Sequence, residues 1–549
     1  MKNLMQYVQN LTNTPQSEAI PGSAQVPNSA GGYAWPVDDW TRLDRFLVLG
    51  AEGGTFYIGE RTLTRENAAA VIRCIAADGE RAVARIVEIS EAGRAPKNDP
   101  AIFALALAAT DGNEATKRAA FAALSSVCRT GTHLFHFTAF VDGMRGWGRG
   151  LRQAVAAWYS MPAGKLAYQA VKYQQRDGWG HRDLLRLAHP KPEDEQHAAL
   201  YYWMVKGWPG VGDQPHPDEA LRLVWAFERA KRAESAAEII GLIRDHRLPR
   251  EAIPTEWLKN AEVWEALLAE MPLEAMVRNL GTLTRLGVVA PMSEGSGRVV
   301  SRLSDVERLR ASRMHPIKLL GALKTYESGQ GVRGSGRWEP VSQVVDALND
   351  AFYAAFENVV PTGARWVLAL DVSGSMAGNM LAGMPGLDAR VGSAAMCLVT
   401  AATEPQHAIV AFSAAQGGYG GRFGGGEPGL TPVEISPRQR LDDVVKITSA
   451  IPMGGTDCAL PMVWASRKKV EADVFVVYTD SETWAGTPHP AQALREYREA
   501  TGIPAKLIVV GMTSNGFSIA DPDDGGMLDV VGFDPAVPGV MADFVAGRV

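Results

Sequence analysis

The chain has 549 residues, of which 46% are apolar and 21% charged, and its formal net charge is −6. Its length exceeds what one hydrophobic core supports, so we expect two or more domains of ordinary globular composition. The net charge by itself argues against a nucleic-acid partner.

Cysteine usage and hydropathy exclude several classes of protein. The first seven residues lack the apolar segment of a secretory signal, and apolar runs such as 102–109 are too short to span a bilayer. The cysteines lie far apart and form no Cys-x-x-Cys pair, which argues against a disulfide framework or a thiolate metal site. We expect a cytoplasmic protein without a membrane partner. The cysteines are Cys74, Cys128, Cys397 and Cys458.

Charge is unevenly distributed along the chain. From Ala364 onward there are 13 Lys/Arg and 20 Asp/Glu, whereas the preceding 363 residues hold 42 basic and 41 acidic side chains. Within that earlier part, residues 143–192 carry nine Lys/Arg and two Asp. Local fields decide where a polyanion binds, so this basic stretch remains a candidate interface.

The first 360 residues divide into an arm and a helical region. Residues 1–35 are rich in Pro, Ser, Asn and Gly and are predicted to be a loosely ordered N-terminal arm. Residues 36–360 show one helical pattern after another and no predicted strand, which indicates an α-solenoid of the HEAT type. A multi-lobed irregular α domain is the alternative. The clearest predicted helices span 113–128, 151–159, 163–175, 218–231, 233–245, 259–269, 315–327 and 341–356.

Residues 361–549 alternate between apolar strand-like runs and helical segments. This alternation predicts an α/β domain with a mostly parallel, doubly wound sheet. The Gly-rich stretch 416–426 is predicted to be a flexible surface loop. The predicted strands span 365–370, 408–412, 474–478 and 506–510, and a helix is predicted around 387–402.

A divalent-cation site is predicted directly after the strand 365–370. Asp371, Ser373 and Ser375 are alternate residues of a tight turn and can aim three oxygens at one point. Loops at the carboxyl ends of strands form the binding crevice of an open α/β sheet, and Thr456 and Asp480 come from two later loops of that kind. Carboxylate, hydroxyl and water oxygens suit Mg²⁺, the expected ion.

These five residues resemble the metal-ion-dependent adhesion site of von Willebrand A domains, in which Asp-x-Ser-x-Ser is followed by Thr and then Asp. The resemblance covers about residues 364–549 and implies that the metal binds a carboxylate of a partner. The family often has Gly after the last Asp, whereas Ser481 and Glu482 follow here. The alternative is that Asp371 and the serines only cap the next helix.

Residues 172–189 concentrate basic side chains on a predicted pair of helices. Lys172 and Arg176 are four residues apart and are predicted to share one helix face. Clustered cations on a rigid surface suit phosphate contacts, and aromatic rings can stack on unpaired bases. The alternative is a solvated face of a solenoid helix. The second helix is predicted to present Arg182, Arg186 and His189 on one face.

Two further segments are candidates for RNA contact. The stretch 143–152 places basic residues among glycines, which would let an RNA backbone approach closely; these residues are Arg145, Arg149 and Arg152. Arg278 lies on a helix that otherwise has a core pattern, and an internal ion pair is an equal alternative for it. His315 precedes Pro316 and is predicted to fix a helix start.

Several phrases together resemble the TROVE module followed by a von Willebrand A domain, the plan of the Ro autoantigen family. The resemblance runs over nearly the whole chain. It implies a HEAT-repeat ring whose ends the A domain brings together. The phrases lie at residues 42–50, 172–189, 276–284, 315–316 and 371–375.

The resemblance also implies partners. It implies that small noncoding Y RNA binds the outer basic surface, with contacts at Lys172, Arg176 and His189. It implies that single-stranded 3′ ends of misfolded or precursor RNA enter the central hole, and that RNA passes to a 3′→5′ exonuclease. The stretch 143–152 and the segment 276–280, which contains Arg278, are the candidates to line this hole. Neither DNA nor a membrane is an expected partner.

Two other functions remain open at this point. The acidic A domain is compatible with a metal-dependent protein–protein adhesion scaffold that binds RNA only incidentally. A metal-dependent hydrolase or nuclease is the weakest alternative, because one metal site without a neighbouring general base does not supply a two-metal in-line mechanism. We therefore expect no enzymatic activity and predict no catalytic residue.

Overall fold

The structure is a computed structural model. It forms two compact units, Met1–Ala70 with Phe356–Val549 (the A unit) and Val71–Ala355 (the helical unit). In the described ranges, no helix combines the length and apolar character that a membrane crossing requires. Residues 1–12 and the Gly-rich stretch 416–426 lie outside these ranges. The structure describes residues 13–50, 63–65, 68–95, 97–208, 212, 214–312, 314–331, 336–355, 360–377, 387–413, 429–436, 439–512, 516–531 and 537–548.

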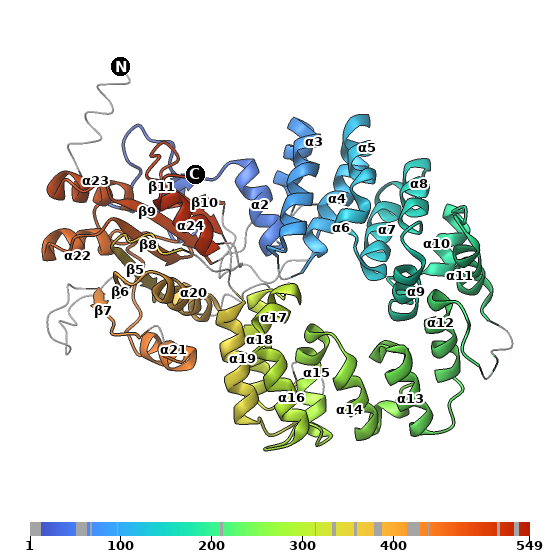
Figure 1. Cartoon of the computed structure of the whole chain (residues 1–549). Helices are drawn as coiled ribbons and strands as arrows, with labels where there is room; N and C mark the ends of the chain where they lie inside the picture. Colours follow the sequence, from blue (N-terminus) through green and yellow to red (C-terminus); the bar gives the residue numbers. More distant parts are fainter. Residues whose placement is uncertain are drawn as a thin grey trace. The chain divides into compact units, whose positions relative to one another are not determined.

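The helical unit is the α-solenoid that the sequence predicts: short helices follow one another in a curved row (Figure 1). Neighbouring helices pack together along the row, and one small hairpin, β3 and β4, interrupts it. The elements are α3 (Ala69–Ala92), α4 (Asp99–Asp111), α5 (Glu114–Ala122), α6 (Leu124–Val127), α7 (Gly131–Arg145), α8 (Arg149–Trp158), α9 (Ala163–Lys172), β3 (Gln175–Arg176), β4 (Trp179–Gly180), α10 (His181–Ala188), α11 (Glu195–Lys206), α12 (Glu219–Ala230), α13 (Ala236–His246), η2 (Arg250–Ala252), η3 (Trp257–Lys259), α14 (Ala261–Glu270), α15 (Leu273–Arg285), α16 (Glu294–Leu303), α17 (Val306–Ser312), α18 (Pro316–Glu327) and α19 (Ser342–Ala354).

The two ends of this row are joined within the helical unit itself. His315 is the N-cap of α18, and its Nδ1 accepts a hydrogen bond of 3.1 Å from the backbone N of Ile317. The predicted role of His315 at a helix start is therefore confirmed. Its Nε2 lies 2.9 Å from the backbone oxygen of Arg94, just after α3. This imidazole therefore ties the start of α18 to the segment that follows the first helix of the unit.

The A unit has the predicted doubly wound sheet. Its strand order is β11-β9-β8-β5-β6-β7, and every pairing except that of β7 with β6 is parallel. Because β5 lies between β6 and β8, its last residue, Asp371, is at the centre of the carboxyl edge. The elements are α2 (Asp39–Leu49), β5 (Trp366–Asp371), η4 (Gly374–Met376), α20 (Ala389–Thr403), β6 (His407–Phe412), β7 (Leu430–Pro432), α21 (Leu441–Ser449), α22 (Leu460–Lys468), β8 (Val474–Thr479), α23 (Pro490–Thr501), β9 (Lys506–Gly511), β11 (Met527–Val531) and α24 (Val537–Val545).

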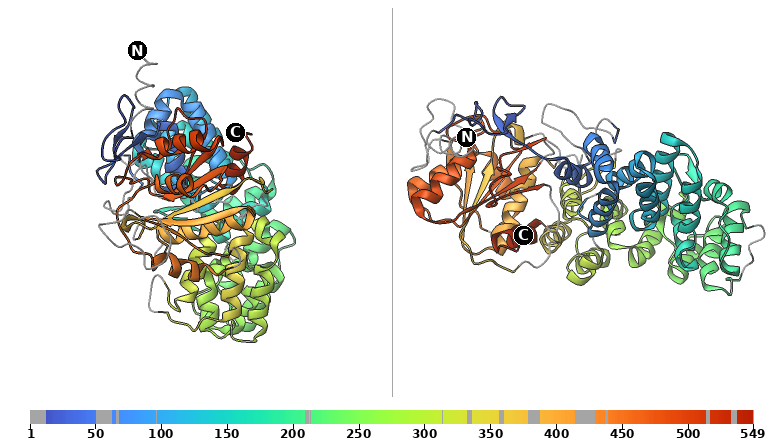
Figure 2. Two further views of the ribbon diagram at one scale, coloured as in Figure 1. Left: turned by 90° about the vertical axis from the view of Figure 1, so that its left-hand side faces the viewer. Right: turned by 90° about the horizontal axis from the view of Figure 1, so that it is seen from above.

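Helices cover both faces of this sheet (Figure 2). Every residue of β5 and β8 is buried, as expected for parallel strands between two helical layers. Val367 and Phe475 face the layer formed by α22 and α23, and α20 packs against β5 and β8. The near-continuous apolar runs that predicted these strands arise from this two-sided burial.

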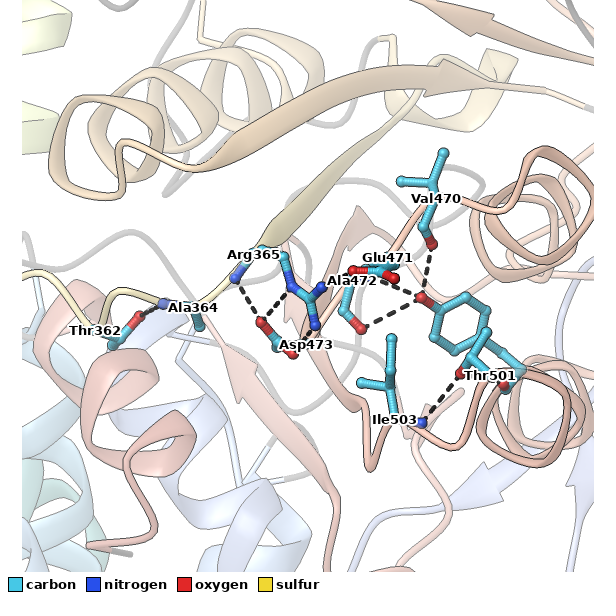
Figure 3. A network of polar contacts seen from close by, with 10 residues as sticks. Thr362, Ala364, Arg365, Val470, Glu471, Ala472, Asp473, Thr501 and Ile503 are labelled. Atoms are coloured by element: carbon cyan, nitrogen blue, oxygen red, sulfur yellow. Dashed lines mark hydrogen bonds and ion pairs between the residues drawn. The ribbon is translucent and has the colours of Figure 1, made fainter.

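A polar network fixes the starts of β5 and β8 relative to each other (Figure 3). The guanidinium of Arg365 bonds both carboxylate oxygens of Asp473, with Nε–Oδ2 at 2.9 Å and Nη2–Oδ1 at 2.7 Å. The Tyr497 hydroxyl donates to the carbonyl of Val470 at 2.7 Å and accepts from the N–H of Ala472 at 2.7 Å. The strand register that aligns the loops at the opposite edge is therefore held at this edge by charged and aromatic side chains.

The segment after residue 12 differs from the loosely ordered arm that its composition predicts. It forms β1 (Val26–Pro27) and β2 (Tyr33–Pro36), and β2 also pairs with β10 (Phe517–Ser518). These strands, together with β3 and β4, also differ from the expectation of no strand before residue 364. Strands of two to four residues are too short to show the alternation of apolar and polar residues by which a strand is recognised in the sequence.

Candidate functional site

The predicted metal ligands after β5 lie close together. Asp371 and Ser373 are each 1% exposed, and Ser373 N donates to Asp371 Oδ1 at 2.9 Å. The hydroxyl oxygens of Ser373 and Ser375 are 3.1 Å apart. The turn therefore brings one carboxylate and two hydroxyls to one point at the carboxyl end of the central strand.

The two later ligands belong to loops that meet this turn. Asp480 directly follows β8, and Ser375 hydrogen-bonds its carboxylate. The carbonyl of Thr456 accepts from the N–H groups of Trp484 at 3.1 Å and Ala485 at 3.0 Å, so its loop is bonded to the loop after Asp480. The structure thus brings the five predicted residues to one edge of the sheet.

The electrostatics of this edge fit a cation. Burial, and then the negative charge of Asp480, raises the pKa of Asp371 to about 7, and burial likewise raises the pKa of Asp480. A divalent cation would offset the repulsion between the two carboxylates. In the described part of the chain, no three or more His, Cys, Asp or Glu side chains are grouped as a metal site would need. A cation at this edge would therefore depend on the serine and threonine hydroxyls as well as on the two carboxylates. The oxygen set of two carboxylates and three hydroxyls therefore suits Mg²⁺ rather than a softer ion.

Two neighbours of Asp371, Thr479 and Cys458, were not predicted. The Thr479 hydroxyl donates to Asp371 Oδ2 at 2.7 Å, and the thiol of Cys458 lies 3.6 Å from the Thr479 hydroxyl. Burial raises the pKa of Cys458 well above its usual range, so the thiol stays protonated and is a poor metal ligand. Thr479 ends an apolar strand run, and no local sequence signal marks its role.

The basic stretch 172–189 is not the helix pair that the spacing predicts. Helix α9 ends at Lys172, and Arg176 lies in β3, so these two residues do not share a helix face. Asp177 and Gly178, with φ of 52° and 79°, form the two-residue turn between β3 and β4. Asp-Gly is a strong hairpin signal, which the four-residue spacing of the cations concealed.

Lys172 is half-buried, unlike the other cations of this stretch. Its Nζ donates to the Tyr168 hydroxyl at 3.1 Å and lies 5.3 Å from the centroids of the Tyr168 and Tyr173 rings. Burial opposes its charge, but the Tyr168 hydrogen bond and the nearby tyrosines and Glu251 outweigh burial, and the pKa of Lys172 is raised. Lys172 therefore carries a charge that its own surroundings already engage.

Helix α10 presents the cations most openly. Arg182 and Arg186 are exposed one turn apart, and His189, also exposed, is the C-cap with φ 49°. Leu184 and Leu185 are buried on the other face. The predicted common face of Arg182 and Arg186 is therefore present on a short, well-packed helix.

His181 anchors α10 and was not predicted. It is buried, with its Nδ1 2.8 Å from the Tyr159 hydroxyl and its Nε2 2.8 Å from the carbonyl of Tyr173. Burial lowers the pKa of His181 to about 4, so the ring is neutral. In this state Nε2–H donates to the carbonyl and Nδ1 accepts from the hydroxyl, which fixes the hairpin to the start of α10.

The second basic segment, around 145–152, neighbours the first. The rings of Trp147 and Trp179 stack with centroids 5.9 Å apart and an interplanar angle of 23°. Arg149 and Arg152 are exposed on α8. The segment 145–152 is predicted to line the central hole and the segment 172–189 to lie on the outer surface, and in the structure their tryptophans pack together. The two segments are therefore neighbours, and their basic and aromatic residues are together called the basic surface: Arg145, Trp147, Arg149, Arg152, Arg176, Trp179, Arg182, Arg186 and His189.

The glycines of this segment have structural reasons of their own. Gly146 has φ 78° and ends α7, and a Cβ on Gly150 would overlap the ring of Phe121. Arg145 is exposed but donates to the carbonyl of Ala109 at 2.8 Å. The helix end at Gly146 and the packing against Phe121 therefore explain two of these glycines without any contact to an RNA backbone.

Arg278 lies apart from the basic surface, on α15. Its side chain is exposed, one turn after Glu274. The Glu274 carboxylate bonds Lys318 Nζ at 2.9 Å, and Lys318, Arg278 and Lys172 together lower the pKa of Glu274 against the effect of burial. Arg278 thus belongs to a cluster of mixed charges around Glu274. This environment resembles the internal ion pair that is the alternative to an RNA contact for Arg278.

Comparisons with known proteins agree on one family. The TROVE domain model matches residues 26–325, and the model of the Ro60 vWA domain matches residues 365–545. The chain is 44% identical to the RNA-binding protein RO60 of Deinococcus radiodurans over 552 residues, covering 100% of both chains. It is 35% identical to the RNA-binding protein RO60 of Caenorhabditis elegans, covering 98% of this chain and 93% of that one.

A solved structure gives the same result. The crystal structure of the Deinococcus radiodurans RO (RSR) protein matches with a TM-score of 0.70 and 43% identity, covering 93% of this chain and 100% of that chain. The match therefore extends over both the helical row and the α/β domain.

Proposed function

Since this chain belongs to the Ro family, in which a TROVE domain precedes a Ro60 vWA domain, we propose that it is a non-enzymatic RNA-binding protein. The observation that carries the proposal is the exposed pair Arg182 and Arg186 on α10, beside the exposed His189. Two arginines on a rigid helix, with a histidine ring at its C-cap, suit the phosphates of an RNA backbone. The net charge of −6 does not oppose this, because local charge directs a polyanion.

The finer assignment follows family membership. Small noncoding Y RNA binds the basic surface, with Arg176, His189 and the half-buried Lys172 as contacts. Single-stranded 3′ ends of misfolded or precursor RNA enter the opening that the helical repeats enclose. The bound RNA is then passed to a 3′→5′ exonuclease. Trp147 and Trp179 support this account, since paired tryptophans hold the two arginine-bearing segments together.

The test is a gel shift with Y RNA at fixed salt. The double variant Arg182→Ala with Arg186→Ala should bind about tenfold more weakly, because two phosphate contacts are lost. Arg232→Ala is the matched control: it removes an exposed arginine elsewhere in the helical unit and should leave binding unchanged. Equal binding by the wild type and the double variant would remove α10 from the interface.

We also propose that the A unit holds one Mg²⁺ through Asp371, Ser373, Ser375, Thr456 and Asp480. When bound, the ion supplies a positive charge that attracts a carboxylate of a protein partner. The donor set and the two mutually repelling buried carboxylates support this role. Metal-dependent protein docking is thus the second candidate function. If it is the main one, Asp371→Ala abolishes partner capture and leaves RNA binding intact.

A further inference from the structure

Residues 13–36, here called the N-terminal brace, are built into the A unit beside the proposed metal site. Gln16 is 0% exposed, and Thr14 and Asn28 are also buried. The backbone of Thr14 bonds Gln492 at 3.1 Å, and β2 of the brace pairs with β10. Polar side chains of this kind are buried only when they have partners, and the partners of Gln16 and Asn28 lie in the metal-site loops.

One amide of the brace joins the two loops that carry the later ligands. Gln16 Nε2 donates to Asp457 Oδ1 at 2.6 Å, and Gln16 Oε1 accepts from the Thr483 hydroxyl. Asp457 directly follows Thr456, and Thr483 comes three residues after Asp480. The separation between Gln16 and these partners exceeds 440 residues along the chain.

The second half of the brace holds the loop after Asp480. Asn28 Nδ2 donates to the carbonyl of Thr483 at 2.5 Å, and the N–H of Ala30 donates to Glu482 Oε2 at 3.0 Å. A Cβ on Gly32 would overlap the Thr483 carbonyl oxygen, so the two backbones approach as closely as a glycine allows. The backbone of the brace at Gly32 is therefore in close contact with the backbone of this loop at Thr483.

The loop after Asp480 needs such support because its backbone is strained. Ser481 has φ 61°, a left-handed conformation that favours glycine, at the position where von Willebrand A domains often have Gly. A non-glycine residue keeps this conformation only where its surroundings over-determine it. The contacts to residues 482 and 483 from the brace supply that constraint immediately after the strained residue.

We propose that the N-terminal brace is a positioning element of the metal site. It holds the loops of Thr456 and Asp480 in the conformation that places their oxygens beside Asp371, and so raises the affinity for the divalent cation. This inference rests on the proposed metal site. Binding linkage then makes the effect reciprocal, so the cation also stabilises the docked brace.

The test measures Mg²⁺ binding to the full chain by isothermal titration calorimetry. Gln16→Ala should weaken Mg²⁺ binding about tenfold, because a buried amide that bonds both loops is lost. Gln25→Ala is the matched control: it removes the same amide from the same segment, where its partners are Ile20 and His489, the N-cap of α23, rather than Asp457 and Thr483. The control should bind within about twofold of the wild type. Equal affinity of Gln16→Ala and the wild type overturns the proposal.

A second substitution separates positioning from general damage to the fold. Adding Ser481→Gly to Gln16→Ala relieves the left-handed strain and should recover most of the lost affinity. Hydrogen exchange gives a readout without metal: the amides of residues 480–484 should exchange faster in Gln16→Ala than in Gln25→Ala. Unchanged exchange contradicts a bracing role.

The outcomes also distinguish the brace from the site on which it depends. If the wild type binds Mg²⁺, Asp371→Ala does not, and Gln16→Ala binds like the wild type, the site stands and the brace is wrong. If the wild type binds no Mg²⁺, the metal site is wrong and the affinity role of the brace falls with it.

Discussion

In the helical unit His181 and His315 are buried and His133 is half-buried, and all three are neutral. Burial lowers the pKa of His133 and His181 to about 4 and that of His315 to about 3. For His181 and His315, each ring accepts at one nitrogen and donates at the other, so a second proton would break a hydrogen bond. These residues make the helical unit sensitive to acid.

The sign of this pH dependence follows from the lowered values. A histidine with a folded pKa below its unfolded value of about 6.5 contributes stability above that pH and loses it as the pH falls towards 4. At pH 5 each such group costs about 2 kcal/mol of unfolding free energy. His181→Gln removes one titrating group, so its unfolding free energy should fall less between pH 7 and pH 5 than that of the wild type. Chemical denaturation at the two pH values checks this, and an equal fall in both proteins would contradict it.

The metal site gives a second prediction at the scale of single residues. Without metal, Asp371→Asn should melt at or above the wild-type temperature, because it removes one of two repelling buried charges. With saturating Mg²⁺ the wild type should gain about 2–3 kcal/mol and the variant nothing. Thermal melting with and without Mg²⁺ measures both effects. Asp443→Asn, an exposed acid on α21, should keep the full Mg²⁺ response.

In the proposed RNA interface, we expect the hairpin β3–β4 to act by holding α10 in position and α10 to act by its charge. Trp179→Ala removes the stack on Trp147 and should weaken RNA binding by a similar factor at every salt concentration, since no charge is lost. Changing both Arg182 and Arg186 to Ala should lower the slope of log affinity against log salt by about 2. Fluorescence anisotropy over a salt series separates the two effects. A change of slope in Trp179→Ala would mean that the hairpin sets the number of phosphate contacts.

Some elements of the fold could be predicted from the sequence and others could not. The strands β5, β6, β8 and β9 were predicted because burial on both faces leaves long apolar runs, and Asp371 was found because it follows such a run. The hairpin β3–β4 was missed, although Asp177 and Gly178 signal it, because the cation spacing suggested a helix. The brace could not be predicted, because Gln16 gains its partners only when residues over 440 positions away fold beside it.

For the helical unit as a whole, His315 connects the two ends of the row. His315→Ala loses the cap of α18 and leaves the Arg94 carbonyl without its bond, so it should cost about 2–4 kcal/mol of stability. Ser235→Ala is the matched control, since it removes a cap in the middle of the row and should cost about 1 kcal/mol. Denaturation of both variants tests the connection, and equal losses would show that the Arg94 bond contributes nothing.

The whole molecule combines a basic surface on its helical unit with an acidic α/β unit. From Ala364 onward acidic residues outnumber basic ones by 20 to 13. This charge distribution agrees with the proposal that RNA binds the helical unit and that metal-dependent docking belongs to the A unit. The salt dependence of RNA binding should consequently be the same in Asp371→Asn as in the wild type.

We expect the basic surface to bind small RNA in the cell. Sequencing of the RNA that co-purifies with the protein from native cells tests this expectation. The wild type should retain small structured RNA and RNA with single-stranded 3′ ends, and the Arg182→Ala, Arg186→Ala variant should lose the small structured class. Recovery of no RNA with the wild type, or of the same RNA with both proteins, would contradict the account.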